Sequence, residues 1–160
     1  MKMREKSLVA LLVVVVSALM LGGCAATQPT AQNKDDLLNN RAIMIADARS
    51  AVPQISIVQL KQMIDENEDF ILIDVRDPND WESGVVDYRN VATISRGMLE
   101  FLAPEHFAVN DPLFVMCKTG LRAALAAKAL QDMGYSNVTG VAQGVDHWQE
   151  AGYPLKDNQI

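Results

Sequence analysis

Two continuous apolar runs, at residues 70–73 (Phe-Ile-Leu-Ile) and 113–116 (Leu-Phe-Val-Met), constrain the fold of this 160-residue sequence most strongly. A strand with one face in water alternates apolar and polar residues, whereas an uninterrupted apolar run is typical of a strand covered on both faces. Helical patterns separate the runs. Ser56 and Gln59 form a capping-box pattern ahead of one helix, and apolar residues recur at helical spacing over 125–133. This alternation predicts an α/β fold with a central, mainly parallel sheet and helices on both faces.

The other predicted elements are shorter. We expect strands at 91–94 and 138–141, a helix that begins at Asp77-Pro78, a helical turn at 98–101 and a last helix at 145–151. Pro at the first helical position, directly after an Asp, is a favoured helix start. A chain of this length suits one folded domain.

The first 23 residues have the composition of an export signal. Basic residues lie within 2–6, an apolar run covers 8–21, and Leu-Gly-Gly-Cys follows at 21–24. The run is shorter than the roughly 20 apolar residues that a spanning helix needs, which disfavours an uncleaved transmembrane anchor. Leu-Gly-Gly-Cys resembles the lipobox of bacterial lipoproteins, and this resemblance implies cleavage before Cys24 and acylation of Cys24 with chains such as palmitate. We therefore predict that residues 1–23 are a lipoprotein signal peptide.

Residues 24–50 are predicted to connect the lipid to the domain. Residues 25–35 are small and polar and indicate a flexible tether. Apolar residues within 37–45 predict a short lead-in helix, and the folded domain then occupies 51–160. No Asp follows Cys24. We expect an extracytoplasmic protein that is anchored to a membrane by lipid, and resemblance to Gram-negative sorting rules favours the periplasmic side of the outer membrane if the organism is Gram-negative.

The charge balance excludes some partners. The chain has a net charge of −6, and removal of residues 1–23 would leave 11 basic against 19 acidic residues, a net charge of −8. An acidic surface repels nucleic acid, so we do not expect nucleic acid as a partner. Anionic lipids would also repel it, and attachment to the membrane must therefore come from the acyl chains.

Cys117 is the chemically most promising residue. Acylation of Cys24 would leave Cys117 as the only thiol, without a partner for a disulfide. Cys117 ends a predicted strand and precedes a predicted helix, so backbone amides at the helix N-terminus can surround the sulfur and stabilise its thiolate. Gly120 permits a close turn, and Lys118 and Arg122 add positive charge. The predicted substrate-binding loop consists of Lys118, Thr119, Gly120, Leu121 and Arg122.

The pattern Cys-x-x-Gly-x-Arg before a helix resembles the active-site loop of the rhodanese sulfurtransferases. Further matches appear in the family's order: Asp74-Val75-Arg76, Trp81, Glu82, Gly144, Trp148, Ala151-Gly152 and Pro154. The resemblance covers about residues 55–155 and implies a single rhodanese-like domain.

The resemblance also implies a reaction. Cys117 would take the sulfane sulfur of thiosulfate or of a persulfide donor as an enzyme persulfide, and would pass it to a thiol or cyanide. Asp74 and Arg76 would support the site. No metal or organic cofactor is implied, and no protein partner can be named.

Other interpretations stay open. Residues 84–92 lack the family's His and Pro and are expected to reshape the rim of the site, which leaves a persulfide carrier or a protein-interaction module without turnover as an alternative. A cysteine phosphatase or arsenate reductase is disfavoured, because their loops resemble Cys-x5-Arg and only four residues separate Cys117 from Arg122. Cys117 could also be an inert core residue. Asp74 is better explained by a hydrogen bond to backbone than by substrate contact.

Overall fold

The computed structural model describes residues 33–158. The predictions for the signal peptide, for Cys24 and for residues 25–32 of the tether lie outside these residues. In chain order, the elements are α2 (Lys34–Ala51), β1 (Gln54–Ile55), α3 (Ile57–Asp65), β2 (Ile71–Asp74), α4 (Pro78–Trp81), β3 (Val85–Val86), β4 (Val91–Thr93), α5 (Leu99–His106), β5 (Leu113–Met116), α6 (Leu121–Asp132), β6 (Val138–Val141), α7 (Val145–Glu150) and β7 (Leu155–Lys156). Within 33–158, none of the helices is long and apolar enough to cross a membrane.

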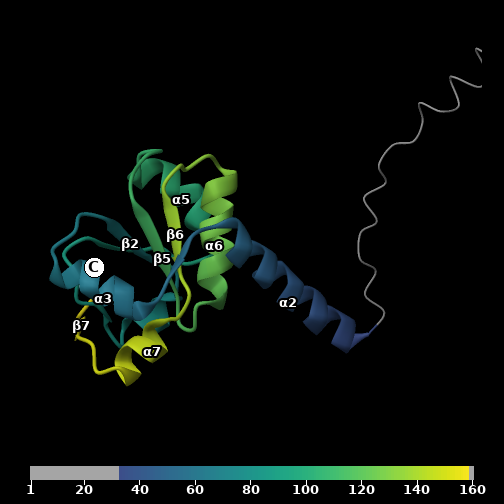
Figure 1. Cartoon of the computed structure of the whole chain (residues 1–160), viewed down its shortest axis with the longest axis horizontal. Helices are drawn as coiled ribbons and strands as arrows, with labels where there is room; N and C mark the ends of the chain where they lie inside the picture. Colours follow the sequence, from purple (N-terminus) through teal and green to yellow (C-terminus); the bar gives the residue numbers. More distant parts are fainter. Residues whose placement is uncertain (1–32, 159–160) are drawn as a thin grey trace, which may run out of the picture. The chain divides into compact units, whose positions relative to one another are not determined.

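The central sheet has five parallel strands in the order β1-β6-β5-β2-β4 (Figure 1). The two apolar runs become β2 and β5, which pair with each other inside the sheet. Their position explains their composition, since side chains on both faces of an inner strand are buried. Strands β3 and β7 form a separate antiparallel pair. The predicted α/β fold with a mainly parallel sheet is confirmed.

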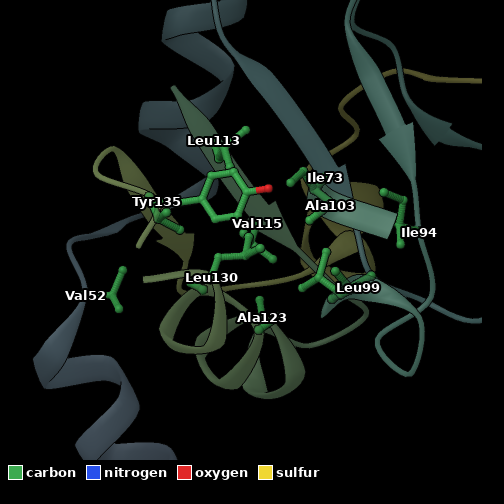
Figure 2. Close-up of a cluster of buried hydrophobic side chains, with 14 of the residues drawn as sticks. Val52, Ile73, Ile94, Leu99, Ala103, Leu113, Val115, Ala123, Leu130 and Tyr135 are labelled. Atoms are coloured by element: carbon green, nitrogen blue, oxygen red, sulfur yellow. The ribbon is translucent and has the colours of Figure 1, made fainter. Parts of the chain in front are cut away.

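Helices cover both faces of the sheet, and each face has its own apolar core. On one face, Ile73 and Val115 pack with residues of α5 and α6, as Figure 2 shows for Leu99 and Ala123. On the other face, the neighbouring strand residues pack against α3 and α7, and this core includes the fully buried Trp148. Successive residues of a strand point to opposite faces, so one apolar run supplies both cores.

Helix α2 is longer than the lead-in helix that the sequence predicts. It begins at Lys34, within the predicted tether, because Asn33 and Asp36 form a capping box. The backbone N of Asp36 lies 3.0 Å from Asn33 Oδ1, and the backbone N of Asn33 lies 3.3 Å from Asp36 Oδ2. At the other end, Ala48 is buried and the helix packs against α6. The cap and this packing outweigh the low helix propensity of the Asn residues.

Within the stretch at 84–92, which departs from the family pattern, Tyr88 and Asn90 contact Phe70 at the edge of the sheet opposite to Cys117. Tyr88 stacks on Phe70 with ring centroids 4.3 Å apart, and its hydroxyl lies 3.2 Å from the backbone N of Phe70. The Asn90 side-chain amide donates to the Phe70 carbonyl at 3.0 Å. Phe70 precedes β2, whereas Cys117 follows the parallel strand β5. The expectation that this stretch reshapes the rim of the site is therefore wrong for residues 88–90.

Candidate active site

Cys117 lies between the end of β5 and the start of α6, and its side chain is buried. Its Sγ accepts hydrogen bonds from the backbone N–H of Gly120, at 3.1 Å, and from that of Ala123, at 3.3 Å. Gly120 is the N-cap residue of α6 and offers no side-chain cap. The sulfur therefore satisfies helix N–H groups that a capping side chain would otherwise bind. Two amide donors and the positive end of the helix dipole thus face the atom on which negative charge would reside during a reaction at this sulfur.

The segment at the start of α7, including the preceding Gly144, determines the shape of the loop. The carbonyls of Cys117 and Lys118 accept hydrogen bonds from the backbone N–H groups of Val145, at 2.9 Å, and Asp146, at 3.1 Å. Gly120 has a φ of 90°, a conformation that side chains rarely adopt. A Cβ on Gly144 would lie 2.0 Å from the carbonyl oxygen of Lys118. The two backbone segments therefore touch, and only a residue without a side chain fits at 144.

Gln143 holds this segment in place. Its side-chain oxygen accepts a hydrogen bond from the backbone N–H of Ile57 at 3.1 Å, at the start of α3. The preceding carbonyl, that of Ala142, accepts from Arg49 Nη2 of α2 at 3.2 Å. Both contacts fix the backbone against which the Cys117 loop packs.

Lys118 and Arg122 are each paired with acidic residues of the segment around α4. Lys118 Nζ lies 3.6 Å from Asp80 Oδ1, and Arg122 Nη2 lies 3.5 Å from Asp80 Oδ2. Arg122 Nη1 also lies 2.8 Å from Asp77 Oδ2. Partial burial opposes ionisation of Asp80, but the charge of Lys118, a backbone hydrogen bond from Asp77 and the contact with Arg122 hold its pKa below the ordinary value.

Arg122 is also influenced by the sulfur itself. Burial lowers its pKa, but the hydrogen bond and charge of Asp77, together with the negative charge of Cys117, outweigh burial and raise the pKa above the ordinary value. Arg122 is thus close enough to Cys117 for the two groups to interact electrostatically through space.

Asp74 and Arg76 form a buried ion pair whose side chains are each only 3% exposed. Asp74 Oδ1 accepts a hydrogen bond from the backbone N–H of Arg76 at 3.0 Å, as the sequence interpretation expected. Arg76 also donates to the carbonyls of Asp80, at 3.0 Å, and Gly84, at 2.7 Å. The pair thus ties the end of β2 to α4 and to the turn that follows α4, which is a structural role.

Residues 56–151 match the rhodanese-like domain family, which is more than half of the chain. The chain belongs to the rhodanese-like family. Among its relatives, the thiosulfate sulfurtransferase GlpE of Pseudoalteromonas translucida is 28% identical over 101 residues, 63% of this chain and 92% of that protein. YrkF of Bacillus subtilis, named as a candidate sulfur carrier protein, is 30% identical over 99 residues, which are 62% of this chain and only 52% of that protein. This chain thus spans about half the length of YrkF.

Solved structures agree with this membership. The polysulfide-sulfur transferase homodimer of Wolinella succinogenes superposes with a TM-score of 0.66 at 33% identity, over 81% of this chain and 96% of that chain. These three related proteins are named for the transfer or carriage of sulfur.

The rhodanese-like domain places its predicted loop residues unevenly around Cys117. The backbone of Gly120 contacts the sulfur, whereas Thr119 and Leu121 are exposed. Sequence reasoning missed the amide of Ala123, although the third residue of a helix regularly donates to a cap. It also missed the acidic partners of the loop, because Asp77 was interpreted only as an N-cap. Asp77 does precede α4, but its side chain makes no cap hydrogen bond.

Proposed function

We propose that this protein is a rhodanese-type sulfurtransferase that moves sulfane sulfur through a persulfide on Cys117. The observation that carries the proposal is the pair of backbone N–H groups, from Gly120 and Ala123, that point at Sγ from the start of α6. An inert core cysteine has no need of two amide donors. Preorganised amides stabilise a sulfur anion throughout the reaction and require no rearrangement when the charge moves.

The chemistry proceeds in two displacements. The Cys117 thiolate attacks the outer sulfur of thiosulfate, the donor S–S bond breaks, and sulfite leaves with the electron pair while the Cys117 persulfide anion forms. A persulfide donor reacts in the same way and releases a thiolate. Cyanide or a thiolate then takes the outer sulfur and regenerates the Cys117 thiolate, so charge and electrons balance in both steps. We propose no metal or organic cofactor for this sequence of steps.

Entry of the donor requires side chains to move, because Cys117 has no exposed surface. Lys118 and Arg122 are 52% and 35% exposed in their side chains, respectively. Exposed ion pairs contribute only about 0–1 kcal/mol, so rearranging these two side chains costs little. We propose that they admit the donor and hold its anionic group.

A sulfur carrier without turnover is the second candidate. It is supported by the burial of Cys117 and by similarity to YrkF, a protein named for sulfur carriage. A carrier would accept sulfur from a protein donor but would turn over thiosulfate and cyanide only slowly. Steady release of thiocyanate favours the enzyme, whereas one sulfur bound without turnover favours the carrier.

We propose that the protein acts outside the cytoplasm, anchored to the outer membrane through an acylated Cys24. The basic start, the apolar run and Leu-Gly-Gly-Cys at 21–24 support this location. We expect radiolabelled palmitate to enter the wild-type protein in a Gram-negative host, and Cys24→Ser to abolish the labelling. Equal labelling of both proteins would contradict the anchor.

The persulfide on Cys117 can be detected by mass spectrometry. The mature chain with Cys24→Ser has Cys117 as its only thiol. After incubation with thiosulfate and removal of excess donor, we expect intact-mass spectrometry to show one added sulfur, which cyanide removes. Cys117→Ala should show no adduct because it retains the fold but lacks the nucleophile. A folded, reduced protein that gains no sulfur from thiosulfate or from a persulfide donor would refute the proposed function, and hydrolysis of a phosphate ester would favour the phosphatase alternative.

A further inference from the structure

Asp80 occupies the position between the two cations of the Cys117 loop. Its two carboxylate oxygens face different partners, Oδ1 towards Lys118 Nζ at 3.6 Å and Oδ2 towards Arg122 Nη2 at 3.5 Å. The Asp80 side chain is 26% exposed, whereas the Asp77 side chain is 66% exposed and contacts Arg122 alone. Asp80 therefore already fills, within the protein, the place that an incoming anion would take between Lys118 and Arg122.

We propose that Asp80 is a specificity-determining residue that selects sulfur donors by charge, so that monoanionic donors are favoured over the dianion thiosulfate. This inference rests on the proposed function, because it concerns the donor of the Cys117 reaction. It also names a donor class: compounds that carry sulfane sulfur with a single negative charge, such as alkyl persulfides and thiosulfonates.

Hydrogen bonds fix the position of Asp80 beside the two cations. Arg76 Nη1 donates to the Asp80 backbone carbonyl at 3.0 Å, and the same guanidinium is anchored by the buried Asp74. The Asp80 backbone is thus fixed, and its carboxylate stays close to the loop when the side chains of Lys118 and Arg122 move. An entering anion must share Lys118 and Arg122 with a negative charge that stays nearby.

The net charge around the loop also disfavours a dianionic donor. Two cations, Lys118 and Arg122, face two carboxylates, Asp77 and Asp80, so these four groups add no net positive charge to attract a donor. The remaining attraction comes from the amides at the start of α6, which act at the sulfur. Repulsion from a fixed carboxylate grows with the donor charge, and a dianion therefore loses more than a monoanion.

Thiosulfate and methanethiosulfonate form a suitable pair of probes. Both present the same outer sulfur, but methyl replaces one charged oxygen, so the charge falls from −2 to −1. Cys117 would displace sulfite from one and methanesulfinate from the other, and the same persulfide results. With Asp80→Asn, we expect KM for thiosulfate to fall about five- to tenfold and KM for methanethiosulfonate to fall about twofold, because one repulsive charge at short range is removed. We expect kcat to change less than about twofold, since the Cys117 amides are untouched.

Two matched variants serve as controls. Asp132→Asn removes the same charge from the opposite end of α6, where it pairs with Lys128, and should leave both KM values unchanged. Asp77→Asn should lower KM for thiosulfate by less than Asp80→Asn, because Asp77 is more exposed and touches one cation only. A change in KM for thiosulfate that is equal in Asp132→Asn and Asp80→Asn would show a general charge effect and overturn the proposal.

Equilibrium binding separates this inference from the proposed function. In a Cys117→Ser background, which cannot form a persulfide, titration calorimetry should show that Asp80→Asn tightens thiosulfate binding about five- to tenfold and methanethiosulfonate binding about twofold. That outcome supports charge selection even if the wild type forms no persulfide. Weaker or unchanged thiosulfate binding would overturn it even if turnover is observed, and would mean that Asp80 only orients Lys118 and Arg122.

Discussion

Replacement of Gly144 by Ala should severely impair sulfur transfer. A Cβ at this position would lie 2.0 Å from the carbonyl oxygen of Lys118 and 2.3 Å from the backbone N of Thr119, so the backbone of the Cys117 loop must move. The amides that bind Sγ would move with it. A displacement of about 1 Å in a reacting geometry can cost about 100-fold, and we expect a loss of that order or more in kcat/KM for thiosulfate. Overpacking should also lower the free energy of unfolding by about 1–3 kcal/mol.

Gly97→Ala is the matched control for this substitution. A Cβ on Gly97 meets no atom within 4 Å, and its φ is not in the left-handed region. We therefore expect unchanged kcat/KM and a free energy of unfolding within about 0.5 kcal/mol of the wild type, as for most exposed sites. Thiosulfate kinetics and urea denaturation measure both quantities. Wild-type activity in Gly144→Ala would show that the contact between residue 144 and the loop does not fix the sulfur site.

Arg76→Ala should cause the largest loss of stability. It leaves the Asp74 carboxylate, 3% exposed, without its guanidinium partner, and it frees the carbonyls of Asp80 and Gly84. Breaking a buried ion pair by removing one partner costs about 3–5 kcal/mol, a large part of the roughly 5–15 kcal/mol that holds a domain folded. We expect urea denaturation to show this decrease in the free energy of unfolding, and the α4 turn that carries Asp80 should loosen.

The double variant Asp74→Ala/Arg76→Ala tests the cause. Without an unpaired buried charge, it should lose less stability than the two single variants together. Lys128→Ala serves as the control, because Lys128 and Asp132 form an exposed i,i+4 pair worth about 0.3–0.5 kcal/mol. If Arg76→Ala cost no more than Lys128→Ala, the Asp74–Arg76 ion pair at the end of β2 would not hold this part of the fold.

The fold was largely predictable because its signals are local. The two apolar runs were assigned to strands that are covered on both faces, and they are neighbours in the sheet as β2 and β5. The capping box at Ser56 and Gln59 starts α3 as expected. Helix α2 was underestimated, since its stability depends on packing against α6, a contact that joins segments far apart in the chain. Sequence periodicity carries no information on such a contact.

The sequence predicted the residues that contact the sulfur better than it predicted the residues around them. Cys117 and Gly120 follow from a strand, a loop and a helix that are consecutive in the chain, so local reasoning places an amide beside the sulfur. Residues 88–90 were predicted to lie at the rim of the site, but they lie at the opposite edge of the sheet. Its position depends on the stacking of Tyr88 on Phe70, which lies 18 residues earlier.

By itself, the sequence determined the α/β class, the order of the elements and the position of a thiol at the end of a buried strand. Only the tertiary structure decided the charge around that thiol. The sequence predicted Lys118 and Arg122 as two positive charges beside the thiol. In the structure they form ion pairs with Asp77 and Asp80, about 40 residues earlier in the chain. The physical reason is that secondary structure reflects interactions over a few residues, whereas electrostatics depends on distance in space, which folding alone sets.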